Sequence, residues 1–289
     1  MEKKMFKTQP FVSEKVWGYE RWIVSTLEAG QSRVDDSVPK LGGMMLGNIV
    51  GNNYPLLVKV IQANNTLSVQ VHPDDEYARI YEHSAGKTEC WYILDAEEGA
   101  SLVCGLKKDY GREELFTAIK ENRLEEYLNI IPVKKGDFVY IPAGTVHAIG
   151  GGFKILEVQQ SSDITYRLYD WGRPRELHIE KALASLKFDE IHTEKPFTGR
   201  FDCRYFSLEI LKIAGKTELV MQDKSSSKMQ QLLFVINGSG SAISESDGAM
   251  LELAPDRLIA VSPEEKLILS GKLDIMKICC VSGDSETFA

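Results

Sequence analysis

The chain has few cysteines, and their arrangement argues against disulfide bonds. It contains five in 289 residues, an odd number, and none are paired at the two-residue spacing of redox or zinc motifs. The adjacent Cys279 and Cys280 would point to opposite faces of a strand, which argues against a redox pair. We therefore expect reduced cysteines in the core of a cytoplasmic protein.

Long hydrophobic runs and an excess of positive charge are also missing. No stretch approaches 18 consecutive apolar residues, and no apolar run follows the charged residues 1–10, so we expect neither a signal peptide nor a membrane span. The 34 Lys and Arg residues are outnumbered by 42 Asp and Glu residues, which leaves a net charge of −8. Long-range repulsion then argues against nucleic acid or an anionic membrane as the main partner.

The composition provides ample material for a core. With 43% hydrophobic and 26% charged residues, it is typical of a globular enzyme with one large or two modest domains. Strand patterns dominate, and a charged, proline-containing stretch at residues 189–198 predicts a domain boundary. We predict a catalytic domain at residues 1–195, with a helical segment at about 109–129, and a second β domain at residues 196–289.

One polar face of a predicted strand is unusual. Apolar and polar residues alternate through residues 67–72, which is typical of a half-buried strand and points Gln70 and His72 to the same side. An amide and an imidazole on an inward face indicate a polar partner such as a metal ion. An isolated histidine is more often a structural group than a ligand, so His72 alone does not establish a site.

A second motif strengthens the metal hypothesis. Residues 136–147 carry the spacing G-x5-P-x-G-x2-H, which matches the second motif of cupin barrels and places His147 at the start of an inward-facing strand. Alternation in residues 89–94 makes Glu89 a third inward donor. Two imidazoles, a carboxylate and an amide oxygen are the donor set of a catalytic zinc site, although donor type alone leaves iron and manganese open.

Further polar residues are candidates for contacts with a ligand. Lys59 interrupts an apolar strand, so its ammonium either reaches water or binds a phosphate or hydroxyl. Glu157 lies on a predicted strand from which it can face the same cavity, and Arg167 is a candidate for binding an anion through two hydrogen bonds. In the C-terminal half, the proline turn at 261–264 is not followed by histidine, which indicates a degenerate repeat without metal.

Taken together, these segments resemble the type I mannose-6-phosphate isomerases, a zinc-dependent family of the cupin superfamily. The resemblance covers most of residues 11–190. The chain lacks the extended helical domain of longer members and is similar to the short bacterial form. The segments that carry the resemblance are residues 55–61, 67–75, 86–89, 136–147 and 161–167.

The resemblance implies a mainly β fold of two cupin-like barrels of jelly-roll type, the first metal-binding with a short helical insertion and the second degenerate. It also implies one Zn²⁺ per chain. The implied metal ligands are Gln70, His72, Glu89 and His147. The implied catalytic residues are Arg167, Lys87 and Glu157, and the implied substrate-binding residues are Lys59, Lys87 and Arg167.

The implied reaction interconverts mannose 6-phosphate and fructose 6-phosphate through an enediol. The group that carries the proton stays open between Glu157 and a zinc-bound water. Two other functions fit the same donors, an iron-dependent oxygenase and a non-catalytic sugar-binding cupin. We expect a phosphosugar as the partner, no nucleic acid or membrane, and a monomer or homodimer in the cytoplasm.

Overall fold

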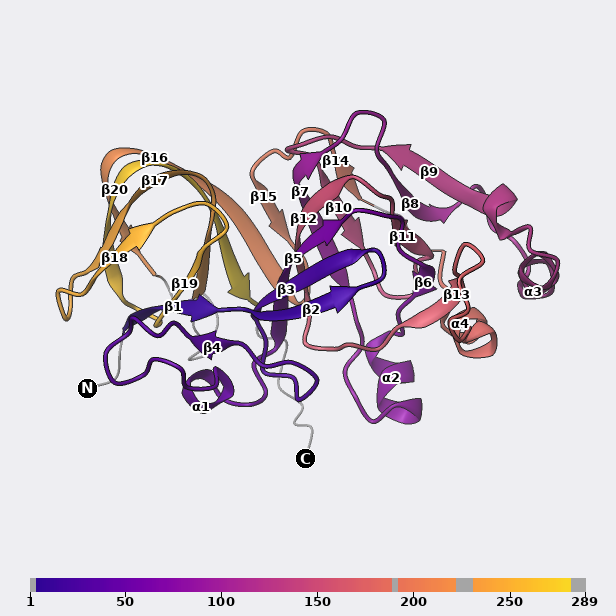
Figure 1. Ribbon diagram of the computed structural model, residues 1–289, viewed down its shortest axis with the longest axis horizontal. Coiled ribbons are helices and arrows are strands. Elements are labelled where there is room, and N and C mark those ends of the chain that lie inside the picture. Colours follow the sequence, from indigo (N-terminus) through magenta and orange to yellow (C-terminus); the bar gives the residue numbers. More distant parts are fainter. Residues whose placement is uncertain (1–3, 189–191, 222–230, 282–289) are drawn as a thin grey trace. The chain divides into compact units, whose positions relative to one another are not determined.

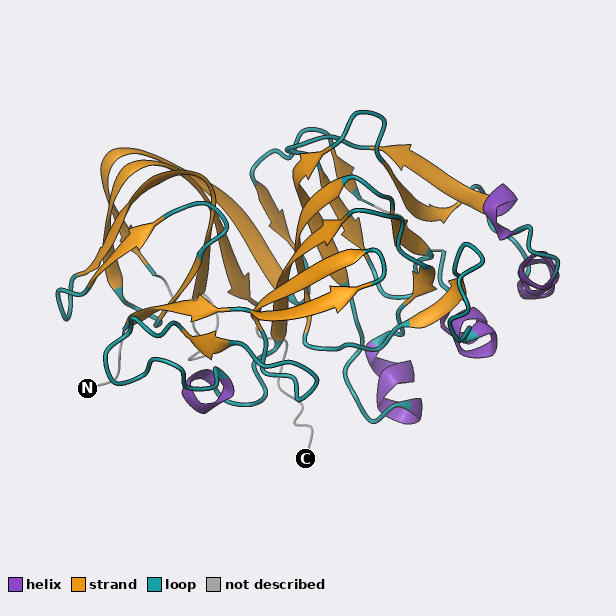
Figure 2. Cartoon of the chain, in the orientation of Figure 1, coloured by secondary structure: helices purple, strands orange, loops and turns teal. Residues whose placement is uncertain are grey.

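The structure is a computed structural model that describes residues 4–188, 192–221 and 231–281. Strands dominate and the helices are short, which confirms the predicted mainly β fold (Figure 2). In the described part of the chain, the strands form three antiparallel sheets of eight, seven and five strands (Figure 1). No helix in the described ranges has both the length and the apolar composition that a membrane crossing requires.

Contacts divide the chain into two compact units. The central unit comprises Val12–Arg21 and Val58–Phe197. The terminal unit comprises Met1–Phe11, Trp22–Leu57 and Thr198–Ala289, as far as those ranges are described. The domain boundary between residues 195 and 196 stays a prediction from the sequence. The contacts group two N-terminal ranges, Met1–Phe11 and Trp22–Leu57, with the C-terminal residues.

The central unit is built on the seven-stranded and five-stranded sheets. The larger sheet has the order β14–β10–β7–β12–β5–β3–β2, and the smaller has the order β13–β6–β11–β8–β9. The larger sheet contains β2 (Phe11–Lys15), β3 (Gly18–Val24), β5 (Leu56–Ala63), β7 (Glu89–Ala96), β10 (Phe138–Ile141), β12 (Phe153–Gln160) and β14 (Thr193–Glu194). The smaller sheet contains β6 (Val69–Val71), β8 (Ser101–Leu106), β9 (Leu128–Pro132), β11 (His147–Ile149) and β13 (Tyr166–Tyr169).

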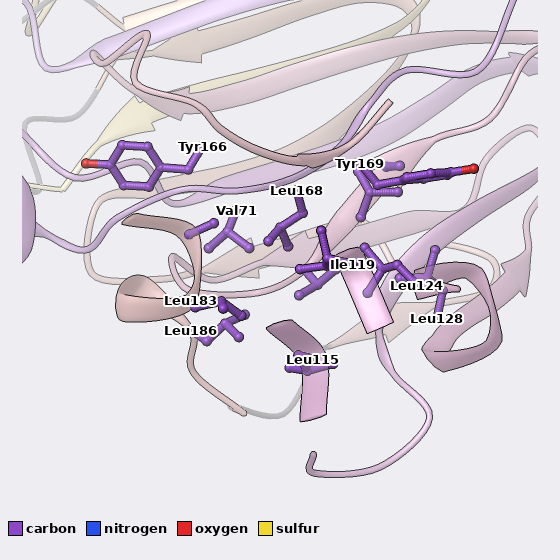
Figure 3. Packing of buried hydrophobic residues seen from close by; sticks show 14 of the residues in the cluster. Val71, Leu115, Ile119, Leu124, Leu128, Tyr166, Leu168, Tyr169, Leu183 and Leu186 are labelled. Carbon is purple, nitrogen blue, oxygen red and sulfur yellow. The ribbon is translucent and has the colours of Figure 1, made fainter. Parts of the chain in front are cut away.

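Short helices cover one face of the five-stranded sheet. Figure 3 shows Leu115 and Ile119 packed in one apolar cluster with Val71 and Leu168. The cluster is buried because alternate residues of each strand carry apolar side chains toward the helices. The helices of the central unit are α2 (Asp75–Tyr81), α3 (Arg112–Lys120), the 3₁₀ helix η1 (Leu124–Tyr127) and α4 (Ile179–Ser185). Both α3 and η1 fall in the helical segment expected at about 109–129.

The opposite face of the same sheet contributes to a second core. Cys104 of β8 packs there with Trp91 and Ile93 of β7 and with Ile155 of β12, from the seven-stranded sheet. Side chains at Gln70 and His147 point to this inner side, because their neighbours Val69 and Val146 belong to the cluster under the helices. The alternation therefore places the polar candidates between the two sheets.

The terminal unit is built on the eight-stranded sheet, with the order β15–β16–β20–β17–β19–β1–β4 and β18 paired with β17. Its strands are β1 (Met5–Gln9), β4 (Arg33–Val34), β15 (Arg200–Asp202), β16 (Phe206–Val220), β17 (Gln231–Ser244), β18 (Met250–Leu253), β19 (Leu258–Val261) and β20 (Lys266–Cys280). Its helix is α1 (Gly47–Val50). The N-terminal strand β1 pairs with β19, where Met5 lies opposite Val261.

The long strands of the terminal unit differ from the sequence-based expectation. The sequence predicted separate strands at 206–213 and 218–221, whereas β16 is continuous through Gly215. Gly215 lies opposite Gly271, and Gly271 lies opposite Gly240, so a row of glycines crosses three strands. Gly215 and Gly271 have φ angles of +90° and +125°, which glycine adopts without strain, so the row bends the strands without interrupting their pairing.

Candidate metal centre

Four predicted donors meet between the sheets of the central unit. His147 begins β11 and lies directly opposite Gln70 of β6, so these two side chains project together. His72 follows β6 by one residue, and Glu89 begins β7 of the facing sheet. His72, Glu89 and His147 are buried, with at most 1% of each residue exposed. Segments far apart in the sequence therefore deliver one polar cluster to the core.

The three charged or titratable donors are close enough to share one cation. The Nε2 atoms of His72 and His147 lie 3.2 Å apart. Glu89 Oε2 lies 3.5 Å from His72 Nε2, and Glu89 Oε1 lies 3.3 Å from His147 Nε2. In the described part of the chain, this is the group of His, Cys, Asp or Glu residues whose ligand atoms could hold a metal, all within 4.8 Å of one another.

Backbone carbonyl groups fix both imidazole rings. His72 Nδ1 lies 2.8 Å from the carbonyl oxygen of Ile164, and His147 Nδ1 lies 2.9 Å from that of Thr145. A carbonyl can only accept, so each Nδ1 carries the proton and donates it. Both Nε2 lone pairs are thereby directed at the shared space, the arrangement that orients histidine ligands in metal sites.

The donor set is electron-rich and fits a cation. Two Nε2 lone pairs and a carboxylate repel one another at these distances unless positive charge lies between them. The Lys87 ammonium supplies part of this positive charge, since its Nζ lies 2.8 Å from His72 Nε2 and 2.9 Å from Glu89 Oε2. Glu89 Oε1 has no hydrogen-bond donor among the described residues. The residues present therefore suit a metal ion that binds oxygen and nitrogen.

Gln70 completes the cluster with its amide group. Its Nε2 lies 3.2 Å from His147 Nε2 and 3.5 Å from His72 Nε2, so the amide donates toward the imidazoles. A half-turn of the amide would exchange nitrogen and oxygen, and the oxygen is the atom that binds metals. Gln70 is thus placed to be a ligand after this rotation.

Burial sets the protonation of the two histidines. It lowers the pKa of His147 to about 4 and, with the nearby Lys87 ammonium, holds the pKa of His72 well below its usual range. Both rings are therefore neutral at pH 7, the form that binds metals. Burial raises the pKa of Glu89, and the Lys87 ammonium opposes that rise. A bound cation would favour the carboxylate form in the same way.

Lys59 and Glu157 form a buried ion pair. Lys59 Nζ lies 3.0 Å from Glu157 Oε1, and Trp91 Nε1 donates to Glu157 Oε2 at 2.9 Å. Burial disfavours both charges, yet the pKa of Lys59 is raised by Glu157 and Glu20, and that of Glu157 is lowered mainly by Lys59. Because Lys59 is only 5% exposed, the alternative in which its ammonium reaches water is wrong.

Arg167 lies on β13, which pairs with β6 on the side opposite β11. It pairs with Gln70 in the register of β13 and β6, so its side chain starts on the inner side of the sheet. Its Nη1 donates to the carbonyl oxygen of Glu176 at 2.7 Å, and its Nε has no acceptor among the described residues. Burial and the nearby Arg175 lower the pKa of Arg167. In the described structure no hydrogen bond or ion pair joins Arg167 to the donors.

Sequence reasoning missed several polar residues around the cluster. Glu20 lies 3.8 Å from Lys59 Nζ, and the adjacent Gln159 and Gln160 are buried at the end of β12. Gln159 lies opposite Glu89 in the register, and its Nε2 donates to the carbonyl oxygens of Gln160 and Ser162. For Gln159 the sequence carried a signal, because this residue has the same strand parity as Glu157, whereas Gln160 has the opposite parity.

Comparisons with known proteins identify relatives of this chain. A family model for the catalytic domain of type I phosphomannose isomerase matches residues 28–100, which include three of the four donors. Mannose-6-phosphate isomerase ManA of Bacillus subtilis (strain 168) is 37% identical over 278 residues, spanning 82% of this chain and 86% of that protein. The probable mannose-6-phosphate isomerase GmuF of the same organism is 36% identical, spanning 81% and 86%.

Solved structures show the same fold. The mannose 6-phosphate isomerase from Bacillus subtilis superposes with a TM-score of 0.83 at 29% identity and covers 96% of this chain and 100% of that chain. Phosphomannose isomerase from Salmonella typhimurium has a TM-score of 0.69 at 17% identity and covers 97% and 100%. The similarity extends over both units, not only over the part that contains the donors.

Proposed function

The chain belongs to the type I phosphomannose isomerase family, and from that premise we propose that it interconverts mannose 6-phosphate and fructose 6-phosphate with one bound Zn²⁺. The observation that carries the proposal is the buried group formed by His72, Glu89 and His147, with both Nε2 lone pairs and a carboxylate directed at one point. A structural core has no need for such a costly cluster.

In the proposed centre, Gln70, His72, Glu89 and His147 hold the metal. When bound, the ion supplies a positive charge that polarises the sugar oxygens at C1 and C2. The backbone carbonyls of Ile164 and Thr145 keep the two imidazoles in the ligating tautomer without a change of shape during the reaction. The chain thereby preorganises the donors before substrate binds.

The isomerisation moves a proton between C2 and C1 through an enediol, so it needs a proton acceptor and positive charge near the developing oxyanion. We assign proton transfer to Glu157, which is ionised and whose two oxygens are oriented by Lys59 and Trp91. The carboxylate takes the proton from C2 and returns it to C1, while the C2 hydroxyl loses a proton and the C1 oxygen gains one, so the reaction consumes no oxidant or reductant.

Lys87 and Arg167 supply the cationic charge in this proposal. Lys87 is 4% exposed and already contacts two of the donors, so its ammonium can stabilise negative charge that develops next to the metal. Arg167 has an unpaired Nε and starts from the strand position beside Gln70, from which it can bind substrate oxygen or phosphate. Lys59, which is buried and paired with Glu157, contributes to substrate binding through its positive charge.

The test is a coupled assay with mannose 6-phosphate, run before and after a chelator and after re-addition of Zn²⁺. We expect turnover to fall to background with chelator and to return with Zn²⁺. Metal analysis should give one ion per chain. Oxygen uptake with iron as the bound metal would favour an oxygenase, and sugar binding without turnover would favour a non-catalytic cupin; either result would contradict the proposal.

The location and the assembly remain predictions. The composition favours the cytoplasm, since the chain has a net charge of −8 and no disulfide pattern. A monomer or a homodimer is expected, and the native mass in solution would distinguish the two. Neither outcome affects the metal centre, whose donors all come from the central unit of one chain.

A further inference from the structure

Gln160 connects two segments of the chain, residues 72–75 and residues 86–89, each of which contains a proposed metal donor. Its backbone N–H donates to the carbonyl oxygen of Thr88 at 3.1 Å, and its side-chain Oε1 accepts from the Thr88 N–H at 2.9 Å. Its Nε2 donates to Asp75 Oδ1 at 2.9 Å. These partners fix the orientation of the amide, because Thr88 N–H can only donate and the carboxylate of Asp75 accepts.

Asp75 completes the connection from the other side. Its Oδ1 also accepts from the Gly86 N–H at 3.0 Å. The backbone runs close here, since Lys87 N–H donates to the carbonyl oxygen of Pro73 at 3.0 Å. A Cβ at Gly86 would lie 2.5 Å from the backbone nitrogen of Asp75, so the absence of a side chain permits the approach.

The connected residues stand next to the donors without touching them. Asp75 follows His72 by three positions, and Thr88 immediately precedes Glu89. Gln160 points away from the donors, because its neighbour Gln159 is the residue that lies opposite Glu89. Gln160 is 7% exposed and Thr88 is 3% exposed, so water is poorly placed to replace the side-chain bonds.

We propose that Gln160 and Asp75 are positioning residues that hold the His72 and Glu89 segments at the spacing the metal requires. The two side chains act together as one brace. Asp75 belongs to the segment that contains His72, residues 72–75, and Gln160 is hydrogen-bonded to the backbone of the segment that contains Glu89, residues 86–89. The inference rests on the proposed metal centre, and it assigns a role to residues outside the ligand set. Such outer residues typically change metal affinity by about 10–100-fold.

The test compares Asp75→Ala with Asp75→Asn. Both remove the same negative charge from the first turn of α2, but an asparagine Oδ1 can still accept from Gly86 and Gln160. Titration of the metal-free protein with Co²⁺, followed by its visible absorption, reports affinity and ligand geometry without an activity assay. We expect Asp75→Ala to weaken Co²⁺ binding at least about tenfold and Asp75→Asn to stay within about threefold of wild type.

Gln160→Leu is the second arm, and it keeps the proposal testable if Asp75→Ala fails to fold. We expect a similar loss of Co²⁺ affinity, with turnover restored to within a few-fold when the metal saturates the site. Gln231→Leu is the matched control, because Gln231 is a glutamine of similar burial in the terminal unit. Unchanged Co²⁺ affinity in Asp75→Ala and Gln160→Leu would overturn the brace alone. Wild-type protein that binds no Co²⁺ would overturn the metal centre together with the brace.

Discussion

The central and terminal units fill their interiors in opposite ways. Among the described residues, eight buried Asp, Glu, Lys and His side chains lie in the central unit, against Glu265 alone in the terminal unit. The terminal core is instead an apolar cluster that includes Leu233, Leu269 and Ile275. Since buried charge opposes folding, its concentration in one of the two β units marks that unit as the candidate for carrying chemistry.

The buried charges of the two units also differ in their partners. Glu265 accepts hydrogen bonds from Ser244 Oγ at 2.9 Å and from the N–H and Oγ of Ser246, so its environment satisfies it locally. In the central unit, Glu89 Oε1 has no donor among the described residues and faces an imidazole lone pair. The carboxylate of Glu265 therefore has its hydrogen-bond donors within the protein, whereas the carboxylate of Glu89 is suited to a bound cation.

The largest expected effect follows from removing a donor of the central unit. His147→Ala should abolish stoichiometric Zn²⁺ binding and lower turnover by more than about a hundredfold, because the ligand and its orienting bond to Thr145 are both lost. Metal analysis and the coupled assay measure the two effects. The control is Glu265→Gln in the terminal unit, which should retain both properties. If His147→Ala retained both metal and turnover, the assignment of the metal centre to this part of the central unit would be contradicted.

The next largest effect is expected from removing a positive charge near the proposed metal centre without removing a metal donor. Arg167→Ala should lower kcat by about a hundredfold, the scale of losing one oxyanion-stabilising donor, while metal content stays at one ion per chain. Arg200→Ala is the matched control, since Arg200 is an exposed arginine of the terminal unit paired with Asp202. Near-normal turnover of the Arg167 variant would remove this residue from the mechanism.

A smaller effect is expected from the glycine row of the terminal unit. In Gly271→Ala the added Cβ would lie 2.3 Å from the carbonyl oxygen of Ser239, at a φ angle of +125°, so we expect a loss of about 2 kcal/mol in the free energy of unfolding. Urea denaturation measures it. Gly111→Ala, where nothing lies within 4 Å and φ is −63°, should lose less than about 1 kcal/mol. Equal losses would show that position 271 does not require glycine.

The smallest effect concerns acid stability. The hydrogen bonds from Ser246 and Ser244 outweigh burial and lower the pKa of Glu265, so the carboxylate stabilises the fold above its unfolded pKa and loses this contribution as pH falls through the folded pKa. Glu265→Gln should therefore reduce the free energy of unfolding by about 1 kcal/mol at pH 7, and the difference from wild type should shrink toward pH 3. A difference that grows on acidification would contradict this assignment.

The convergence of the candidate donors could be predicted because strand alternation is local. Gln70 and His72 share a face by parity, and the turn glycines and proline before His147 fix where the next strand starts. The same locality explains what was missed. Gln160 contacts Thr88 and Asp75 across 72 and 85 positions, and no periodicity encodes such a pairing.

The terminal unit was harder to predict from the same patterns. The sequence pattern predicted separate strands on either side of Gly215 and of Gly271, but these two glycines pair with each other within continuous β16 and β20. Likewise, nothing local in residues 5–7 indicates that they pair with residues 259–261. Contacts of this range depend on the completed sheet and not on the segment itself.

The pairing of β1 with β19 has a consequence for biosynthesis. During translation, Met5 emerges early, but its partner Val261 is added only after more than 250 further residues. The ribosome delivers every residue of the central unit before β19 exists, so that unit can fold first while β1 has only the short strand β4 to pair with. The nascent chain can thus assemble the candidate metal centre early and complete the eight-stranded sheet last.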